Sequence, residues 1–388
     1  MKRILNCPNK VKRIVIIADT FHPSKDGVVR FIDELVTGIC DLYHTTLLVP
    51  TFPLRYYPPT DDSKYPCKVI RVPVIPVRLH SYFWSLLSPS VFREIYRADI
   101  VIHNSFAPLG VFSFLLAHML RKTQILFTHH NEMEMLHHAF DIPRVLKINF
   151  AYSAVQIHRR IKYFVYATSK FGIKIKKFTG RTDCMVQVPF VISPPTVIDT
   201  KKVKYLRRVF KAGDKRILLY IGRFSGEKNL AVITEVLGEL SKRSDVRSVM
   251  VGGGYLLENM RYLAKKKRYD ILFPGVIPED YLWELYSISD FLISPTPHES
   301  LSFTVVEAMS QGTIPVVNGN YSENYLMDST SIKIYNITNP AQIISKVSEV
   351  LDDNEKLEKY KETISHLDFT GTREQFRSTW LKVLQDNI

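Results

Sequence analysis

Residues 220–230 read YIGRFSGEKNL, and this stretch decides how the second half of the chain folds. The apolar run at its start predicts a strand that ends at Gly222, and a helical pattern begins near Asn229. The loop between them carries Arg223 and Lys228, five residues apart. Such a loop directs backbone N–H groups and the positive end of a helix to one place, so two further cations there would suit a diphosphate. Two solvated surface cations are the alternative.

A second strand-to-helix segment follows at residues 295–309, which read PTPHESLSFTVVEAM. An apolar run precedes it, and Ser302 takes the N-cap position of a helix that ends near Gly312. Glu299 and Glu307 have seven residues between them, one in the loop and one inside the helix. We expect both carboxylates to face the same ligand.

The two glutamates and the helix start favour different ligand groups. Carboxylate oxygens only accept hydrogen bonds, so Glu299 and Glu307 suit the hydroxyls of a sugar and a ribose. The N–H groups of residues 300–304 would face a phosphate. Alternatively, Glu299 interacts only with the helix dipole and Glu307 is a solvated helix residue. The apolar residues on both sides of Glu307 make a solvated position less favourable.

Short apolar strands alternate with helical stretches along the chain, which is typical of parallel sheets covered on both faces. Consecutive prolines at 194–195 interrupt this pattern, which then restarts. We therefore expect an α/β protein of two Rossmann-like, doubly wound domains that face a central cleft, residues 1–192 and 193–365. A terminal segment, 366–388, is expected to carry a helix that packs back toward the first domain. Ligands of such sheets bind at the carboxyl ends of the strands.

The periodicity predicts individual elements. Strands are expected at 13–18, 46–49, 69–72, 100–102, 125–127, 217–221, 246–251, 271–273, 291–293 and 314–317. Helices are expected around 31–42, where Phe31, Leu35, Ile39 and Leu42 lie near one face, and at 132–160, 230–240, 256–267, 281–288, 303–311, 343–351 and 373–384.

Composition narrows the function classes. Of the 388 residues, 46% are hydrophobic and 23% are charged, as in globular proteins. Lys and Arg outnumber Asp and Glu by 52 to 38, and the net charge of +14 must serve solubility, an anionic ligand or an anionic surface. The four cysteines have no paired spacing, which argues against a disulfide framework and a zinc site and favours a reducing compartment. No apolar run reaches the length of a bilayer span.

Together, these ordered segments resemble the retaining glycosyltransferase family 4, the glycosyl transferases group 1. The resemblance rests on Gly222-Arg223-x4-Lys228, on Glu299-x7-Glu307 with the glycine and proline that follow, on strand-end turns at 251–254 and 273–276, and on a first loop at 19–28. It covers nearly the whole chain and implies the two-domain GT-B fold. Asp26 and Ser302 stand where the family usually has glycine.

The resemblance also implies roles for single residues. Arg223 and Lys228 would hold the diphosphate of the donor and stabilise negative charge on the departing nucleotide. Glu307 would bind the ribose, and Glu299 the hydroxyls of the transferred sugar. A histidine after the strand at 125–127 would contact that sugar near its anomeric carbon; the register favours His130, with His129 as the alternative. Donor-binding positions would further include Gly27, Gly253, Gly275, Val276, Ser300, Leu301, Ser302 and Phe303.

The function expected is that of a retaining, metal-independent hexosyltransferase without a cofactor. It would move a hexose from a UDP- or GDP-linked sugar to a lipid, lipid-linked or glycan acceptor. The sequence has no Asp-x-Asp motif of the metal-bridging type, and retention follows from the resemblance only. The alternatives are an epimerase or phosphorylase of the same fold, and a non-catalytic protein that binds nucleotide sugars or an anionic surface.

The segment from Lys147 to Arg181 suggests a further partner. It is rich in Lys and Arg interleaved with Phe and Tyr, which predicts docking on an anionic membrane surface. A solvated basic face is the alternative. The expected location is the cytoplasm, with a peripheral position on the cytoplasmic membrane face. No nucleic-acid-binding motif is present, so nucleic acid is not an expected partner.

Overall fold

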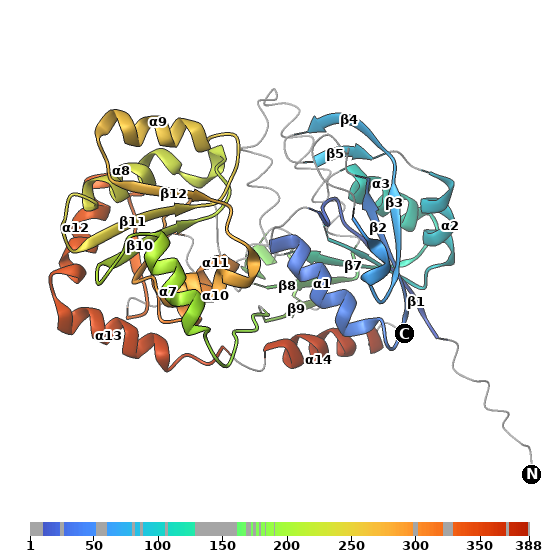
Figure 1. Ribbon diagram of the computed structural model, residues 1–388. Helices are drawn as coiled ribbons and strands as arrows, with labels where there is room; N and C mark the ends of the chain where they lie inside the picture. The colour runs from blue at the N-terminus through green and yellow to red at the C-terminus, as the bar shows by residue number, and fades with distance from the viewer. Residues whose placement is uncertain are drawn as a thin grey trace, which may run out of the picture. The chain divides into compact units, whose positions relative to one another are not determined.

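Two parallel sheets form the framework of the protein, one in each of two compact units. The first unit comprises residues 1–191 and 372–388, and the second comprises residues 192–371 (Figure 1). The computed structural model describes residues 11–23, 27–51, 60–79, 82–85, 88–104, 108–128, 161–167, 172–173, 176–177, 180–182, 184–189, 191–297, 302–320, 329–369 and 372–386.

The first unit has a seven-stranded sheet in the order β3-β2-β1-β6-β7-β8-β9, with every neighbouring pair parallel. Its strands are β1 (Arg13–Ile17), β2 (His44–Pro50), β3 (Lys68–Val72), β6 (Ile100–His103), β7 (Thr123–Thr128), β8 (Tyr163–Tyr166) and β9 (Met185–Gln187). A separate antiparallel hairpin consists of β4 (Val74–Leu79) and β5 (Tyr82–Ser85). The helices are α1 (Gly27–Ile39), the short η1 (Asp62–Lys64), α2 (Pro89–Arg97) and α3 (Pro108–Met119).

The second unit has a six-stranded parallel sheet in the order β12-β11-β10-β13-β14-β15. Its strands are β10 (Arg216–Ile221), β11 (Val246–Val251), β12 (Ile271–Gly275), β13 (Phe291–Ser294), β14 (Ile314–Asn318) and β15 (Ile332–Ile334). Its helices are α7 (Thr200–Val209), η2 (Gly226–Lys228), α8 (Leu230–Leu240), α9 (Leu257–Lys267), η3 (Glu279–Tyr281), α10 (Leu282–Ser287), α11 (Phe303–Ser310), α12 (Pro340–Leu351) and α13 (Asn354–Ser365). Helices lie on both faces of the sheet (Figure 1), which buries β11 along its whole length.

Helix α14 (Thr372–Gln385) returns to the first unit and packs against α1. Phe376 and Trp380 are fully buried, and the Trp380 ring meets Phe127 edge-on with centroids 5.2 Å apart. At the rim, Arg373 pairs with Glu34 and Arg377 donates to the Gly38 carbonyl. Because α14 fills one face of the first sheet, the segment after α13 is part of the core of the first unit.

The strands that the periodicity predicts are all present, with bounds that differ by at most a few residues. The helix expected at 230–240 is α8 at the same bounds, and the helix expected at 132–160 lies outside the described residues. The analysis of periodicity missed the β4–β5 hairpin, β8, β9, β15 and four helices: α2, α3, α7 and α13. Helix α3 is apolar on nearly all sides, so it carries no helical alternation in its sequence.

Two cysteines that lie far apart in the sequence are neighbours in space. Cys40 follows α1 and Cys67 precedes β3, and a hydrogen bond joins their side chains. This bond lowers the pKa of Cys40 and raises the pKa of Cys67, because it stabilises the thiolate of the acceptor. The spacing of these two free cysteines in the sequence therefore does not reveal that they are neighbours in the fold.

We predict that Trp380→Ala destabilises the first unit by about 3–5 kcal/mol, because a fully buried indole leaves a cavity between α14 and the sheet. Urea unfolding followed by far-UV circular dichroism measures the change. Ser378→Ala, on the exposed face of the same helix, should change the unfolding free energy by less than about 0.5 kcal/mol. Equal stability of the Trp380 variant and the wild type would contradict this packing.

His103 at the end of β6 predicts a pH-dependent stability. Its ring is fully buried, Nε2 lies 2.8 Å from Oε1 of Gln124, and burial lowers its pKa to about 4. In the unfolded chain the pKa is near 6.5, so the unfolded state binds the proton more tightly and acid favours unfolding. The free energy of unfolding should therefore fall by about 2 kcal/mol from about pH 7 to about pH 5 because of this group.

Urea unfolding of the wild type and of His103→Gln at both pH values measures this contribution. The pH dependence between the two conditions should be smaller in the variant by about the same 2 kcal/mol. A variant with the full pH dependence of the wild type would show that His103 is not the group responsible.

Candidate functional site

The strand order of the second sheet marks the place where a ligand is expected. Chain progression reverses between the adjacent central strands β10 and β13, because β11 lies on one side of β10 and β14 lies on the far side of β13. In open parallel sheets of this kind, the loops after the two strands separate and leave room for a ligand at their carboxyl ends. These loops are residues 222–229 and 295–302, the two segments singled out from the sequence.

The loop after β10 is fixed by its own backbone and by one buried aromatic ring. The N–H of Gly222 donates to the carbonyl of Val251, and the hydroxyl of Tyr220 donates to the carbonyl of Arg223. Phe224 is fully buried and its N–H donates to the carbonyl of Gly253. The backbone of this loop is therefore held at each end. The side chain of Arg223 is exposed on it.

Lys228 is the last residue of the short helix η2, in the same loop as Arg223. Its side chain is half-buried, and its N–H donates to the carbonyl of Ser225. The N–H of Gly226 donates to the hydroxyl of Tyr255, which comes from the loop after β11. Both predicted cations thus lie beyond the carboxyl end of β10, on a loop that the neighbouring loop supports.

Two asparagine side chains hold the loop after β13. The amide of Asn229 donates to the carbonyl of Pro295 and to that of Ile337, at 3.2 and 2.9 Å. Asn229 itself has a left-handed backbone, with φ of 54°. The amide of Asn318, at the end of β14, donates to the carbonyl of Thr296 at 3.0 Å. Asn229 therefore joins the loop that carries the cations to the loop that precedes α11.

Glycines allow the loops after β11 and β12 to approach β10 closely. Gly252 has φ of +130° and donates its N–H to the carbonyl of Gly275. A Cβ on Gly252 would lie 1.9 Å from the carbonyl oxygen of Gly222, so no other residue fits this conformation. Gly253 follows, close to the exposed side chain of Val276. The predicted donor-binding positions Gly253, Gly275 and Val276 thus border one another.

Helix α11 begins where its sequence predicts. Ser302 is its N-cap residue, and the carbonyl of Ser302 accepts from the N–H groups of Val305 and Val306. The Ser302 hydroxyl makes no capping hydrogen bond, and Phe303 is the first helical residue. The predicted site residues Glu299, Ser300 and Leu301 lie outside the described residues.

Glu307 is buried inside α11, so the alternative of a solvated helix residue is wrong. Its carboxylate accepts a hydrogen bond from the hydroxyl of Tyr286, at 3.0 Å. Tyr286 is itself buried and belongs to α10. A buried carboxylate needs hydrogen-bond donors, and Tyr286 supplies one of them. Sequence analysis missed Tyr286, because only the packing of α10 on α11 reveals it.

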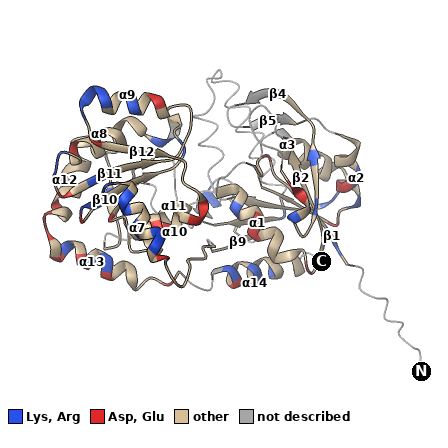
Figure 2. Ribbon diagram, viewed as in Figure 1, with Lys and Arg blue, Asp and Glu red and all other residues tan. Residues whose placement is uncertain are grey.

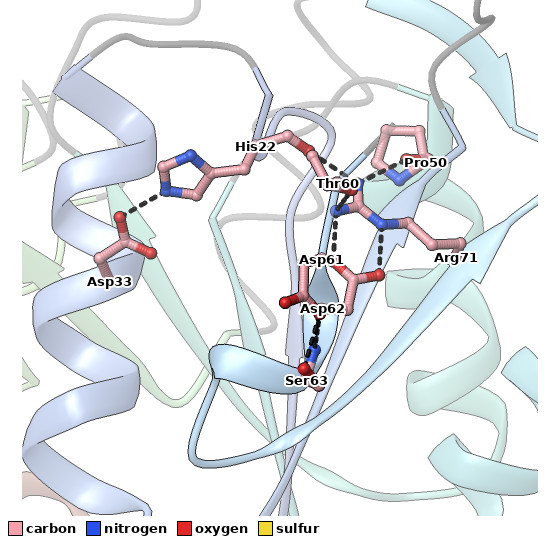
Figure 3. Close-up of polar contacts among 8 residues, drawn as sticks. All are labelled: His22, Asp33, Pro50, Thr60, Asp61, Asp62, Ser63 and Arg71. Atoms are coloured by element: carbon pink, nitrogen blue, oxygen red, sulfur yellow. Dashed lines mark hydrogen bonds and ion pairs between the residues drawn. The ribbon is translucent and has the colours of Figure 1, made fainter. Parts of the chain in front are cut away.

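In the first unit, the loop after β1 is held by residues that no local pattern reveals. Figure 3 shows Arg71 of β3 between the carbonyl of His22, 2.7 Å away, and the carboxylate of Asp62, which it contacts through two nitrogens. On the other side of the loop, the imidazole of His22 lies 2.7 Å from the carboxylate of Asp33 on α1. His22, which precedes the predicted site residue Gly27 in the chain, is thus held by β3 on one side and by α1 on the other.

Asp19 ties the same loop to α3. Its two carboxylate oxygens accept from the N–H groups of Leu109 and Gly110, at 2.8 and 3.0 Å, in the first turn of that helix. Asp19 is buried, so the helix dipole and the two N–H groups compensate its charge. The first turn of α3 is therefore already occupied by a carboxylate of the chain.

Several predictions concern residues outside the described part of the chain. Strand β7 ends at Thr128, directly before His129 and His130, and neither histidine is described. The basic segment from Lys147 to Arg181 is described only in part. Within the described ranges, no three His, Cys, Asp or Glu side chains are grouped so that they could hold a metal ion. The helices of these ranges are also too short or too polar to cross a bilayer.

Comparison with known proteins gives a family for the second unit. Residues 202–366 match the family model of glycosyl transferases group 1. The alpha-monoglucosyldiacylglycerol synthase of Streptococcus pneumoniae is 23% identical over 83% of this chain and 75% of its own length. The alpha-D-kanosaminyltransferase of Streptomyces kanamyceticus is 25% identical, and the match spans 42% of this chain and 43% of that relative. An uncharacterised glycosyltransferase of Methanocaldococcus jannaschii is 26% identical over 40% of its length.

Solved structures extend the likeness to the whole chain. The Anabaena protein HepE in complex with UDP-glucose superimposes with a TM-score of 0.72 at 12% identity, over 96% of this chain and 98% of that one. The lipopolysaccharide glycosyltransferase WaaG superimposes with a TM-score of 0.69 at 16% identity, over 94% and 98%. The feature that these proteins share with this chain is the fold, two parallel-sheet units. Residues 202–366 are thus a glycosyl transferases group 1 domain, and the chain as a whole has the GT-B fold.

Proposed function

We propose that the protein is a retaining, metal-independent hexosyltransferase of the family 4 type. It takes a hexose from a UDP- or GDP-linked sugar and transfers it to a lipid, lipid-linked or glycan acceptor. The observation that carries the proposal is the pairing of two loops in the second unit. One bears Arg223 and Lys228, the other leads into α11, and the side chain of Asn229 joins them.

The charge at these loops suits the leaving group of such a reaction. Breaking the bond at the anomeric carbon leaves positive charge on the sugar and additional negative charge on the diphosphate. Groups that are already oriented toward the developing charge stabilise it without a reorganisation cost. Arg223, Lys228 and the positive end of α11 supply such groups. In this proposal they do the work that a divalent cation does in other transferases, which matches the absence of an Asp-x-Asp motif.

The buried carboxylate of Glu307 fits the role of a ribose ligand. It accepts from the hydroxyl of Tyr286, which orients it and leaves further lone pairs for other donors. Glu299 and the backbone of Ser300 and Leu301 would bind the sugar hydroxyls and a phosphate. His130 would contact the sugar near the anomeric carbon. These four residues belong to the proposal through the family resemblance.

The choice of donor and acceptor takes support from relatives. HepE is known in complexes with UDP-glucose and with UDP. The Streptococcus pneumoniae relative is by name a synthase of a glucosylated diacylglycerol, and a relative from Salmonella typhimurium, 28% identical over 37% of this chain, is a lipopolysaccharide N-acetylglucosaminetransferase. A UDP-linked donor and a lipid-borne acceptor are therefore the first substrates to test.

We predict that Lys228→Ala lowers turnover of the donor by about 10²- to 10³-fold, because one preorganised charge is lost from the leaving group. The measurement is release of UDP or GDP together with analysis of the glycosylated product. Excess EDTA should leave wild-type turnover unchanged. Product that forms without any acceptor would instead indicate an epimerase.

Thermal unfolding with and without UDP or GDP tests the same residue independently of turnover. The nucleotide should raise the melting temperature of the wild type, since a ligand that binds only the native state stabilises it by RT ln(1 + [L]/Kd). The rise should be much smaller in Lys228→Ala and in Arg223→Ala. Lys204→Ala, an exposed lysine on α7, is the matched control and should keep the full rise. Full turnover and a full temperature rise in Lys228→Ala would refute the assignment.

A further inference from the structure

Large apolar side chains project from α2 and α3 of the first unit. On α2, Phe92 and Tyr96 are 51% and 61% exposed. On α3, Met119 is 79% exposed, and Phe112 and Leu115 are exposed beside it. Single exposed apolar side chains are ordinary, but five large ones on two adjacent helices suggest a contact surface. We call these five side chains and the cations around them the α2–α3 patch.

The two helices lie side by side on the same face of the first sheet. Val91 and Ile95 of α2 and Leu109 and Ala117 of α3 share one buried cluster with β1. Successive residues of a helix are turned by about 100°, so Phe92 and Tyr96 point about 100° away from Val91 and Ile95, and the exposed residues of α3 lie on the side away from Leu109 and Ala117. Both exposed faces therefore point away from the sheet.

Direct contacts join the two exposed faces. The rings of Phe92 and Tyr96 are stacked, with centroids 6.3 Å apart. Lys122, just beyond α3, donates to the carbonyl of Tyr96 at 2.6 Å, and its Nζ lies 5.7 Å from the centre of that ring. The end of α3 with Met119 therefore adjoins the end of α2 with Tyr96, and the apolar side chains form one surface.

Exposed cations surround this surface. Arg93, Arg97 and Arg121 are exposed, and among the described residues none of them has a carboxylate partner. The acidic residue of α2, Glu94, is buried and pairs with Lys68 at 2.7 Å, so it does not neutralise these arginines. After α2, Asp99 accepts from the N–H of Arg13. Figure 2 shows the charges of α2 and a largely uncharged α3 at the same part of the unit.

Exposed apolar side chains next to exposed arginines favour a lipid bilayer over a protein as the partner of this surface. Aromatic residues, Met and Arg also occur at protein interfaces, but three exposed arginines buried by a protein partner would each need a matching carboxylate from it. At the surface of an anionic bilayer, aromatic and aliphatic side chains enter the interface while Arg and Lys meet lipid phosphates. The contact of Tyr96 with Lys122 fits the boundary between lipid and water. The Tyr96 side chain is an apolar ring with a polar hydroxyl, and the Lys122 side chain is an apolar chain that ends in a cation.

We propose that the α2–α3 patch docks the first unit on the surface of an anionic lipid bilayer. The docking requires no membrane-spanning segment and uses different residues from the segment Lys147 to Arg181. It is independent of the transfer chemistry, because its residues belong to α2, α3 and the turn after α3. A protein that fails every donor test could still bind vesicles through this patch.

Flotation of the full-length protein with vesicles tests the proposal. Vesicles of phosphatidylcholine that contain phosphatidylglycerol should carry the protein upward, and vesicles of phosphatidylcholine alone should carry far less. The double variant Arg93→Glu/Arg97→Glu should weaken binding to anionic vesicles by at least about tenfold, because each cation near the surface contributes to attraction. Phe92→Ser/Tyr96→Ser should weaken binding to them as well, through loss of apolar insertion.

Matched variants separate this surface from other basic ones. Lys176→Glu/Lys177→Glu changes two exposed lysines of the segment Lys147 to Arg181, and Tyr262→Ser/Lys266→Glu changes an exposed aromatic and a cation of α9. Both should bind anionic vesicles as the wild type does. Circular dichroism and the temperature rise with UDP show whether each variant is folded and donor-competent.

Hydrogen exchange identifies the contact directly. Amide protection on addition of anionic vesicles should appear in residues 89–97 and 108–122 and not in α9. The proposal is overturned if the wild type does not float with anionic vesicles, if the Lys176/Lys177 variant alone loses binding, or if protection appears elsewhere. Retained flotation of both α2 variants, when folded, would overturn it equally.

Discussion

The geometry of the candidate site depends on the side-chain amide of Asn229. It donates to the carbonyls of Pro295 and Ile337, which lie beyond β13 and β15, while its own backbone ends the loop after β10 in a left-handed conformation. Asparagine tolerates that conformation better than most residues and also supplies two N–H donors. Without these bonds the carbonyls of Pro295 and Ile337 would each lose a hydrogen-bond donor. A residue with a local backbone requirement thus links two segments of the candidate site.

The backbone of the loops after β10 and β11 is held in place although these loops lie at the surface. Gly252 and Gly254 have positive φ, and a Cβ on either would meet the carbonyl oxygen of Gly222 or Phe224. The close approach lets Gly252 and Phe224 complete backbone hydrogen bonds across strand ends. Polar backbone groups satisfied in this way do not need water, which favours a single conformation of the loops after β10 and β11. Preorganised charge is effective in transition-state stabilisation for this reason, and the proposed roles of Arg223 and Lys228 rely on it.

Features that depend on neighbouring residues in the sequence could be predicted, whereas contacts between distant residues could not. Five of the six strands of the second unit (all but β15), α8 and the N-cap at Ser302 depend on neighbours in sequence, and these were predicted. The contacts of Arg71 with His22, and of Asp19 with the first turn of α3, join residues 49 and about 90 positions apart, and no local pattern contains them. The burial of Glu307 was indicated by its apolar neighbours, whereas its partner Tyr286 was not. Spacing also missed the contact of Cys40 with Cys67, since spatial and sequence neighbours differ in a parallel sheet.

The Lys and Arg side chains that produce the positive net charge have different physical roles. Many of the cations are neutralised locally, as in the pairs of Arg243 with Asp245 and Asp352, and the basic last turn of α9 favours its own helix dipole. Arg223 and Lys228 lie on a strand-end loop, where a bound diphosphate would be held partly out of water. The cations of the α2–α3 patch are exposed, so their attraction to lipid falls within a Debye length and weakens with salt. Donor binding and surface docking should therefore differ in salt dependence although both partners are anionic. A rise in ionic strength would release the protein from vesicles before it weakens nucleotide binding, because a desolvated contact is screened less than an exposed one.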